Sequence, residues 1–198
     1  ASSGADLYII DFRADNGIWS TLDTVSSIFT SYVYQDSDAN NIIEDFSVRA
    51  IDTCGNARLR SLTHNSILLT NSSDACDYSI SLDWNGYVNW ENGVSHYKVF
   101  VTEIDNGIPI TSHIRVPVNT ELLLNDISSQ SDYIIYVEAY NDDSTFIAKS
   151  NTLDFGVDLP LKPLFNYLEY ATVDHDNGNV EISCLVDNNA VIDYYDIY

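Results

Sequence analysis

Basic residues are scarce in this chain, where 8 lysines and arginines stand against 30 aspartates and glutamates. The formal net charge of the 198 residues is −22 at pH 7. Proteins that bind nucleic acid neutralise its phosphates with lysine and arginine, so we expect no nucleic-acid partner. The same charge disfavours anionic membrane surfaces. It favours solubility, repulsion between neighbouring molecules and the binding of divalent cations.

Long apolar runs are missing as well. The longest unbroken candidate covers residues 133–137, which is strand length, whereas a membrane helix requires about 20 apolar residues. We therefore expect no direct membrane insertion. The chain contains no methionine, and its start shows no basic segment followed by an apolar one. These two absences suggest a processed product or an excised segment.

Sequence patterns of catalysis are also absent. The chain has no Gly-x-Ser-x-Gly motif, no Cys-His signature and no glycine-rich phosphate loop. Carboxylates are so plentiful that a pair at glycosidase separation would arise by chance. The four histidines are scattered beside turns and strand ends, where we expect surface or hydrogen-bonded side chains: His64, His96, His113 and His175. We expect a protein that is not an enzyme.

Alternation of apolar and polar residues with a period of two dominates the chain, as in residues 78–84, 97–101 and 133–139. This alternation is typical of half-buried strands. Asn-Gly pairs, which suit tight hairpin turns, punctuate the chain at residues 16, 85, 92, 106 and 177. No helical period exceeds about two turns. The sequence therefore predicts an all-β fold, either a β-sandwich or a barrel.

An internal repeat divides the chain into three parts. Residues 8–17 resemble residues 97–107, and residues 48–50 resemble residues 137–139, both at an offset of 89. Residues 182–188 resemble residues 80–85, which begins a third copy. We predict the C-terminal part of one repeat at 1–70, a complete repeat at 71–157 and the N-terminal part of another at 158–198.

Two interpretations of the partial repeats are open. In the first, the sequence is a window on a longer chain. In the second, which we favour less, the two fragments pair head to tail between molecules and complete a sandwich. A partial sandwich leaves strand edges and an apolar face uncovered in either case.

The middle repeat resembles a fibronectin type III domain, which implies tandem immunoglobulin-like β-sandwiches, one complete and two partial. Ile127 precedes the run Tyr133-x-Ile135-x-Val137-x-Ala139, which is similar to that family's sixth-strand pattern, and Trp84 matches the family's core tryptophan. The resemblance implies that the Tyr133 hydroxyl bonds back to nearby backbone. In the first repeat Glu44 and Asp38 replace the corner tyrosine and its apolar partner. We expect a structural core that includes Trp84, Tyr97, Tyr133, Val137 and Ala139.

A narrower resemblance spans residues 46–97. The run Phe46 to Asn56, residues 64–69, Cys76, and residues 80–97 with their Trp90-Glu-Asn-Gly-Val segment are similar to tandem repeats of Bacteroidota surface and secreted proteins. Those chains typically end in a gliding-motility-associated sorting domain of type IX secretion (type B). The resemblance implies export to the extracellular space or the outer-membrane surface of a bacterium. It transfers no catalytic residue.

The chain contains three cysteines, so at most one disulfide can form within it and one thiol is left over. In an exported protein we predict that Cys54 and Cys76 form a disulfide across the junction of two repeats, which would contribute about 3 kcal/mol. Two reduced core cysteines are the alternative. Cys184 shares its phase with Val180 and Ile182, so we expect a buried thiol. No cysteine pair has zinc-ligand spacing.

Calcium is the strongest cofactor candidate, although we expect no cofactor. Asp174, Asp176 and Glu181 superficially resemble a calcium loop, but Glu181 comes too early for the bidentate position. An ordinary turn between two strands is the favoured interpretation. The acidic segments 36–38 and 142–143 are expected to be solvated loops.

The three tryptophans are candidates for stacking on sugars. Trp84 is in phase with the core and is expected to be structural, and packing against their own units is the favoured role for Trp90 and Trp19. The segments 23–25 and 143–145 resemble the O-glycosylation pattern of Bacteroidota, and residues 71–73 form an N-glycosylation sequon.

These observations favour a non-catalytic structural or adhesive repeat segment, a stalk or spacer, of a large exported cell-surface protein. Its expected partners are other domains of the same long chain. The first alternative is a module that binds a protein or glycan ligand with the loops at one end of a sandwich. The second is a set of accessory domains of a secreted hydrolase.

Overall fold

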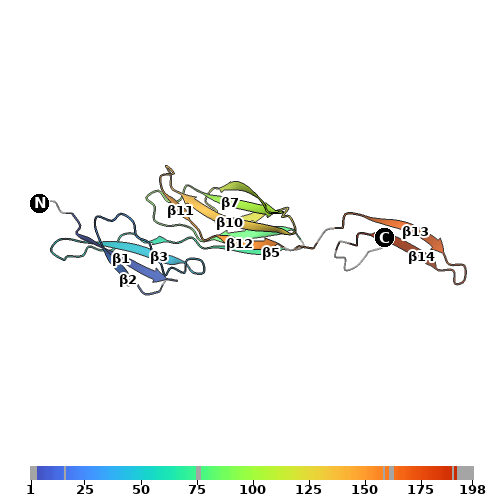
Figure 1. Ribbon diagram of the computed structural model, residues 1–198, viewed down its shortest axis with the longest axis horizontal. Coiled ribbons are helices and arrows are strands. Elements are labelled where there is room, and N and C mark those ends of the chain that lie inside the picture. The colour runs from blue at the N-terminus through green and yellow to red at the C-terminus, as the bar shows by residue number, and fades with distance from the viewer. Residues whose placement is uncertain are drawn as a thin grey trace.

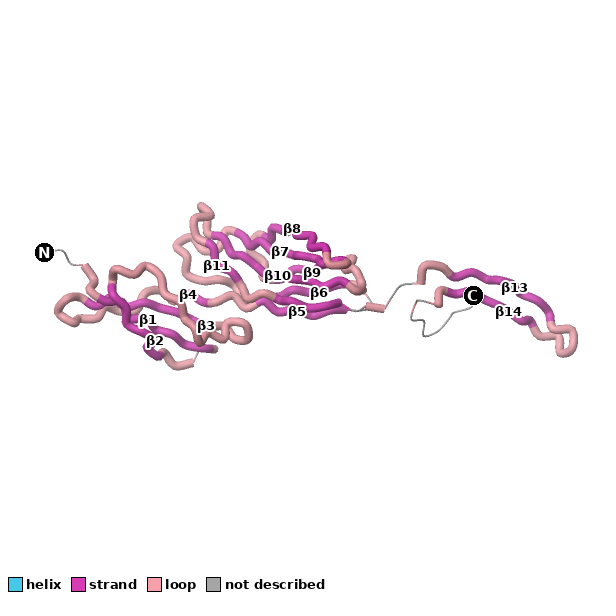
Figure 2. Tube along the Cα trace, viewed as in Figure 1, coloured by secondary structure: helices cyan, strands magenta, loops and turns pink. Residues whose placement is uncertain are grey.

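Figure 1 shows the computed structural model of the chain, which describes residues 4–15, 17–74, 77–157, 159–160, 163–188 and 190. Fourteen strands and no helix occur in these residues (Figure 2). Every pair of neighbouring strands in the four sheets is antiparallel. The all-β prediction is confirmed.

The first sheet has the strand order β2-β1-β3-β4. Its strands are β1 (Leu7–Ala14), β2 (Ser20–Ser26), β3 (Glu44–Ile51) and β4 (His64–Asn65). Successive side chains of a strand point to opposite faces, so β1 divides into an apolar inner row and a polar outer row. The inner row is Tyr8, Ile10 and Phe12, and the outer row carries Asp11 and Arg13.

The second unit is a sandwich of two sheets. One sheet holds β7 (His96–Asp105), β8 (Ile108–Val116), β10 (Ser131–Tyr140), β11 (Ile147–Lys149) and β12 (Leu153–Val157), and β10 pairs with β7, β11 and β12. The other holds β5 (Leu69–Asp74), β6 (Ser79–Trp84) and β9 (Glu121–Leu124) in the order β5-β6-β9. Inward residues of both sheets form one hydrophobic core.

The core of the sandwich contains all five residues that the sequence suggests for it. Their exposed fractions range from 0% to 5%: Trp84, Tyr97, Tyr133, Val137 and Ala139. The largest fully buried side chains around them are aliphatic and come from both sheets. The alternation of apolar and polar residues explains this burial, because the apolar face of each strand turns away from water.

Tyr133 forms a corner between the strands. It is 3% exposed, and its hydroxyl oxygen accepts a hydrogen bond of 3.1 Å from the backbone N–H of Ser128. Burial raises the pKa of Tyr133, so the hydroxyl stays protonated at neutral pH. This bond ties the loop before β10 to the core.

We expect Tyr133→Phe to lower the free energy of unfolding of the second unit by about 1 kcal/mol, because the Ser128 N–H loses its acceptor while the ring stays packed. Urea titration of the purified chain measures the change. Tyr136→Phe on the outer face of the same strand is the matched control and should have a smaller effect. Equal midpoints for both variants would contradict a role for the corner bond.

Glu44 occupies the corresponding position of the first unit, 89 residues earlier. It is 1% exposed, and its carboxylate accepts hydrogen bonds from the Ser37 hydroxyl at 2.6 Å and from the backbone N–H of Asp38 at 2.8 Å. A carboxylate therefore ties down the loop where the second unit uses a tyrosine. The residue types differ, yet the loop before the strand is anchored in both units.

The two units share their strand register. Ile10 pairs with Val48 in the first unit and Val99 pairs with Val137 in the second, an offset of 89 in both strands. The pairing of β4 with β3 matches the pairing of β12 with β10 at the same offset. The first sheet is thus the counterpart of the larger sheet of the sandwich.

The C-terminal part of the described chain is a two-stranded sheet of β13 (Asn166–Val173) and β14 (Val180–Val186). Cys184 is exposed, so the prediction of a buried thiol at this position is wrong. Among the described residues no second sheet faces this hairpin, and an inward phase alone buries nothing. Residues 195–198, whose resemblance to residues 97–100 predicts a third strand, lie outside the described part.

Candidate functional site

The outer face of the first sheet carries a buried carboxylate held by two arginines. Asp11 is fully buried and accepts hydrogen bonds from Arg49 Nε at 2.5 Å, Arg49 Nη2 at 2.8 Å and Arg60 Nε at 2.9 Å. The Thr21 hydroxyl adds a bond of 3.2 Å. Burial raises the pKa of Asp11, but the hydrogen bonds and charges of the two arginines outweigh it, so the pKa lies below the usual range.

Trp19 lies beside this cluster and contacts two cations. The guanidinium carbon of Arg13 is 4.8 Å from a Trp19 ring centroid, and that of Arg60 is 5.2 Å away. Arg13 also forms an ion pair of 2.8 Å with Asp45. These cation–π contacts and ion pairs brace β1 against β3, so Trp19 packs against its own unit rather than presenting a free ring.

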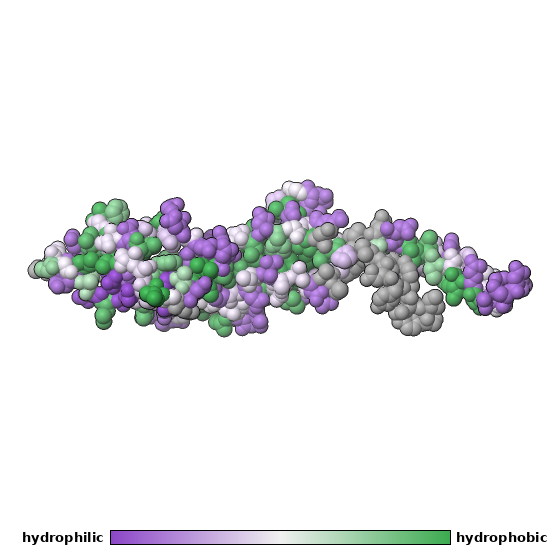
Figure 3. All heavy atoms as spheres, turned by 90° about the horizontal axis from the view of Figure 1, so that it is seen from below, coloured by the Kyte–Doolittle hydropathy of each residue, from purple (hydrophilic) through white to green (hydrophobic). Residues whose placement is uncertain are grey.

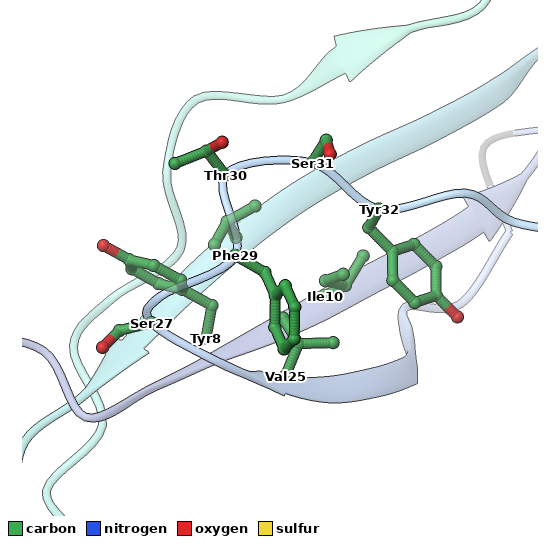
Figure 4. A pocket seen from close by; sticks show the side chains of 9 residues that line it. Tyr8, Ile10, Val25, Ser27, Phe29, Thr30, Ser31 and Tyr32 are labelled. Carbon is green, nitrogen blue, oxygen red and sulfur yellow. The ribbon is translucent and has the colours of Figure 1, made fainter.

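The inner face of the first sheet is apolar and only partly covered. A loop of residues 27–34 arches over it and leaves a cavity of about 360 Å³. Figure 4 shows Phe29 and Tyr32 from this loop on either side of Ile10 of β1. The lining consists of apolar, aromatic and hydroxyl side chains: Tyr8, Ile10, Val25, Ser27, Phe29, Thr30, Ser31, Tyr32 and Val48. Such a lining of apolar and aromatic faces with a few hydroxyl groups is suited to binding.

The junction between the first sheet and the sandwich is fixed by hydrogen bonds. Asn65 at the end of β4 donates from Nδ2 to the Gly86 carbonyl at 2.9 Å and accepts at Oδ1 from the Val88 N–H at 2.9 Å. His64 Nδ1 lies 3.0 Å from the Tyr87 hydroxyl, and their rings are 5.6 Å apart. Asn65 is 9% exposed, so these bonds are shielded from water.

Residues 66–68, which link the two units, are also held by hydrogen bonds. The backbone N–H of Leu68 donates to Asn85 Oδ1 at 2.7 Å, and the Asn85 amide donates to the Ser66 carbonyl at 2.9 Å. Ile67 is 1% exposed and belongs to the core of the sandwich. A chain that inserts a side chain into the next core and pairs its backbone with asparagine is no flexible linker.

The outer face of the larger sheet of the sandwich combines aromatic rings and cations. His96 and Tyr140 stack with ring centroids 4.8 Å apart, and the Lys98 ammonium lies 4.4 Å from the Tyr140 ring centroid. Glu138 accepts from Lys149 at 2.7 Å and from the Tyr140 hydroxyl at 2.5 Å. The basic residues of residues 66–157 are Lys98, Arg115 and Lys149, and all three sit on this face.

The charges of this face are shifted by their surroundings. Burial lowers the pKa of His96, and the positive charges of Arg115 and Lys98 lower it further, so the ring is neutral at pH 7. Burial together with the Glu138 carboxylate raises the pKa of Tyr140 to about 12. These groups stabilise one another across strands.

A smaller cavity of about 260 Å³ lies at the loop end of the sandwich. Its lining combines two aromatic residues with amide and acidic groups: Trp90, Glu91, Asn92, Gly93, Asn141, Asp142, Asp143 and Phe146. Trp90 is half-buried and its ring centroid is 4.3 Å from that of Tyr87. Phe146 is 64% exposed.

The calcium candidates do not converge in the described residues. Asp174 accepts from the Asp176 N–H at 2.9 Å and from the Asn177 amide, while Glu181 accepts from the Tyr170 hydroxyl at 2.9 Å. In the part of the chain that the structure describes, no three His, Cys, Asp or Glu side chains form a group suited to a metal ion. Calcium binding stays an untested alternative to the ordinary turn that the sequence favours.

The cysteine pairing also stays a prediction. Cys54 is an exposed free thiol in the turn after β3, where its N–H is bonded to Asp52. Cys76 lies outside the described residues. The glycosylation candidates fall on exposed residues of β5, on β2 and on the loop before β11.

Sequence reasoning missed the Asp11 cluster and the Asn65 junction. Asp11 lies on the outer side of an alternating strand, so the pattern predicts an exposed side chain. It is buried because β3 brings Arg49 beside it and the segment after β3 brings Arg60. Asn65 could have been suspected only from its place at the end of one repeat.

Comparisons with known proteins add a fold neighbour. No family model matches the chain, and no curated protein matches it. Among solved structures, the FN1–FN3 domains of chicken CNTN1 align with 78% of this chain at a TM-score of 0.35 and 20% identity. The chain spans 57% of the length of that structure's chain.

The strands themselves define the class of protein. A three-stranded sheet packed on a larger sheet, with a tyrosine corner at the start of the central strand of the latter, makes the middle unit an immunoglobulin-like β-sandwich. Its particular form is fibronectin type III-like. In the described residues, no helix has the length and apolarity needed to cross a membrane.

Proposed function

We propose that this chain is a stalk or spacer segment of a large exported cell-surface protein, built from fibronectin type III-like units with bounds near 1–70, 71–157 and 158–198. The observation that carries the proposal is the hydrogen-bonded junction at Asn65, because a spacer must hold its units in a fixed orientation. The units follow one another in single file (Figures 1 and 2), which is the geometry of a spacer.

The acidic composition supports the same function. A net charge of −22 keeps neighbouring stalks apart and soluble. The resemblance of residues 46–97 to repeats of Bacteroidota proteins supports export by type IX secretion to a bacterial surface, with other domains of the same chain as partners. A role in adhesion or gliding motility would then belong to the whole protein.

The junction can be tested by substitution. We expect Asn65→Ala to broaden the distribution of distances between spin labels placed on β2 and β8, because the Val88 N–H and Gly86 carbonyl lose their partner. The cost to stability should be about 1 to 3 kcal/mol. Double electron–electron resonance measures the distances.

Asn92→Ala, an exposed asparagine of the loop before β7, is the matched control and should leave the distribution narrow. A broad distribution in the unsubstituted chain would show a flexible tether and overturn the spacer proposal.

A second candidate function is favoured by the cavity at the loop end of the sandwich. Aromatic faces combined with asparagine and aspartate suit a neutral glycan, whose C–H groups stack on rings and whose hydroxyls bond to amides and carboxylates. Titration calorimetry with a panel of neutral oligosaccharides tests it. Binding that Phe146→Ala abolishes and Phe165→Ala preserves would favour this module function, whereas absence of binding would contradict it.

A further inference from the structure

Strand β8 forms an open edge of the larger sheet of the sandwich. In the part of the chain that the structure describes, β8 pairs with β7 alone, in one continuous register over its 9 residues. The strand belongs to the complete repeat and lies along its side, away from the first sheet and from the hairpin of β13 and β14 (Figure 2). Its open edge therefore does not depend on any sequence that adjoins the chain.

The turn before β8 determines which of its backbone groups point away from β7. Asn106 and Gly107 have positive φ angles of 49° and 78° and join Asp105 to Ile108, the closing pair of a two-residue hairpin. The closing pair exchanges two hydrogen bonds, and such pairs alternate with unbonded pairs along an antiparallel ladder. Even-numbered residues of β8 therefore bond to β7. The odd-numbered residues direct their backbone groups outward: Pro109, Thr111, His113 and Arg115.

The position of the proline agrees with this assignment. Pro109 has no N–H to donate, and it stands at an outward position, where an edge strand tolerates proline. The outward N–H groups of Thr111, His113 and Arg115 have no backbone acceptor among the described residues. Donors at every second residue of an open edge are a template for an added strand.

The two sides of β8 differ in chemistry. Val116 reaches the core and is 6% exposed. The other aliphatic residues on its side of the strand are far more exposed: Ile108 at 65%, Ile110 at 62% and Ile114 at 38%. The opposite side carries hydroxyl, imidazole and guanidinium groups on Thr111, His113 and Arg115. On the face of the molecule seen in Figure 3, hydrophobic and hydrophilic residues are instead mixed over the first unit and the sandwich.

Positive charge is concentrated beside this edge. Arg115 lies directly opposite Lys98 of β7, and like charges in that position repel one another. Among the described residues neither side chain forms an ion pair, whereas Lys149 on the same face is paired with Glu138. Strand β8 contains no aspartate or glutamate. In a chain of net charge −22, this edge is a local reversal of sign that attracts acidic groups.

We propose that β8 binds an extended acidic segment of another protein, which adds to the sheet as an antiparallel strand. Aliphatic side chains of that segment pack on Ile110 and Ile114, and they alternate with acidic or hydroxyl side chains that lie beside His113 and Arg115. Backbone pairing supplies the affinity and the alternation supplies the specificity. The β8 strand of a second copy is a poorer occupant, because it brings no acidic residue and adds a second arginine to the edge.

The experiment is titration of the full chain with the peptide Val-Glu-Val-Glu-Val-Thr-Val, followed by the fluorescence anisotropy of an attached dye. In the antiparallel register its glutamates lie opposite Arg115 and His113, and its valines lie on the side of Ile110 and Ile114. We expect saturable binding that weakens as salt is raised, because salt screens the charges. Replacement of both glutamates of the peptide by lysine should lower the affinity at least tenfold.

Substitutions in the chain separate charge from backbone pairing. Arg115→Glu should lower the affinity at least tenfold, because it reverses the charge that faces the peptide. Arg58→Glu, at an exposed arginine of the segment after β3, is the matched control and should leave the affinity unchanged. His113→Pro removes an outward N–H and should also lower the affinity at least tenfold, whereas His113→Ala keeps that N–H and should retain binding.

Amide hydrogen exchange provides a readout that needs no substitution. The N–H groups of Thr111, His113 and Arg115 should exchange rapidly in the free chain and slowly in the presence of the peptide. Those of Ser112 and Ile114 bond to β7 and should be protected in both states. This alternation along one strand is specific to pairing at the open edge.

Four outcomes would overturn the proposal. The first is the absence of saturable peptide binding. The second is an equal loss of affinity in His113→Pro and His113→Ala, because a side-chain contact would then hold the peptide. The third is binding of polygalacturonate, in place of the peptide, with the same dependence on Arg115, which would assign the edge to an anionic glycan. The fourth is a dimer in light scattering that His113→Pro abolishes, which would assign the edge to a second copy.

Discussion

Replacement of Asp11 by asparagine is expected to destabilise the first unit by about 3 kcal/mol. The carboxylate is fully buried and holds Arg49 through two hydrogen bonds and Arg60 through one. Bonds to charged groups are worth about 1.5 to 3 kcal/mol each, and removal of one member of a buried pair costs about 3 to 5 kcal/mol. The arginines are partly exposed, so water recovers part of this loss.

Hydrogen exchange resolves the effect by unit. Amides of β1 and β3 should exchange faster in Asp11→Asn, while amides of β7 and β10 keep their rates, because the cluster lies in the first unit alone. Asp23→Asn on the exposed side of β2 is the matched control and should change little. Uniform loss of protection in both units would mean that they unfold together and that the cluster is not a local brace.

Low pH should remove the contribution of the Asp11 carboxylate to stability. The pKa of Asp11 is lowered in the folded chain, so its contribution is present above the unfolded value of about 3.9 and is lost as pH falls through the folded value. Below pH 4 the exchange rates of β1 in the unsubstituted chain should therefore approach those of Asp11→Asn. A difference between the two that persists unchanged at pH 2 would contradict the assignment.

Replacement of Trp84 by alanine has the largest expected effect, about 4 kcal/mol on the second unit. The side chain is 5% exposed and packs edge-on against Tyr97, with ring centroids 5.5 Å apart. Truncation of a buried aromatic residue removes its transfer free energy and leaves a cavity, at a cost of about 3 to 5 kcal/mol. The chain should lose the cooperative unfolding of the sandwich at 37 °C.

Two controls separate packing from other effects. Trp84 Nε1 is buried without a hydrogen-bond partner among the described residues, so Trp84→Phe removes an unsatisfied donor and should cost about 1 kcal/mol. Trp90→Ala removes a half-buried ring and should cost less than Trp84→Ala. Thermal unfolding followed by circular dichroism ranks the three variants by stability. A larger loss for Trp90→Ala would place the packing centre at the loops.

Much of the fold could be predicted from the sequence because apolar and polar residues alternate along a strand with one face buried. Residues 133–139 alternate, and every inward member of that run is buried. The 89-residue offset predicted that the units share one plan, and the register of β1 with β3 repeats that of β7 with β10. Asn-Gly turns likewise mark hairpins such as the one at Gly107, where φ is +78°.

The candidate sites were less predictable because they depend on partners distant in sequence. The side chain at position 184 has the phase of a core residue, yet it is exposed because, in the part of the chain that the structure describes, no second sheet faces it. Glu44 stands where the family pattern has a tyrosine, and only its contacts with Ser37 and Asp38 explain why a carboxylate is tolerated in that place.

The sequence by itself determined that this protein is acidic, all-β, repetitive and without the motifs of catalysis, since charge, period and spacing are local properties of the chain. Only the tertiary structure decided which polar residues are buried, how the units are joined and which apolar faces remain open. Asp11, Asn65 and Val48 belong to strands of ordinary pattern. Asp11 and Asn65 have their roles because folding brings distant residues beside them. Val48 stays partly exposed because no second sheet covers it among the described residues.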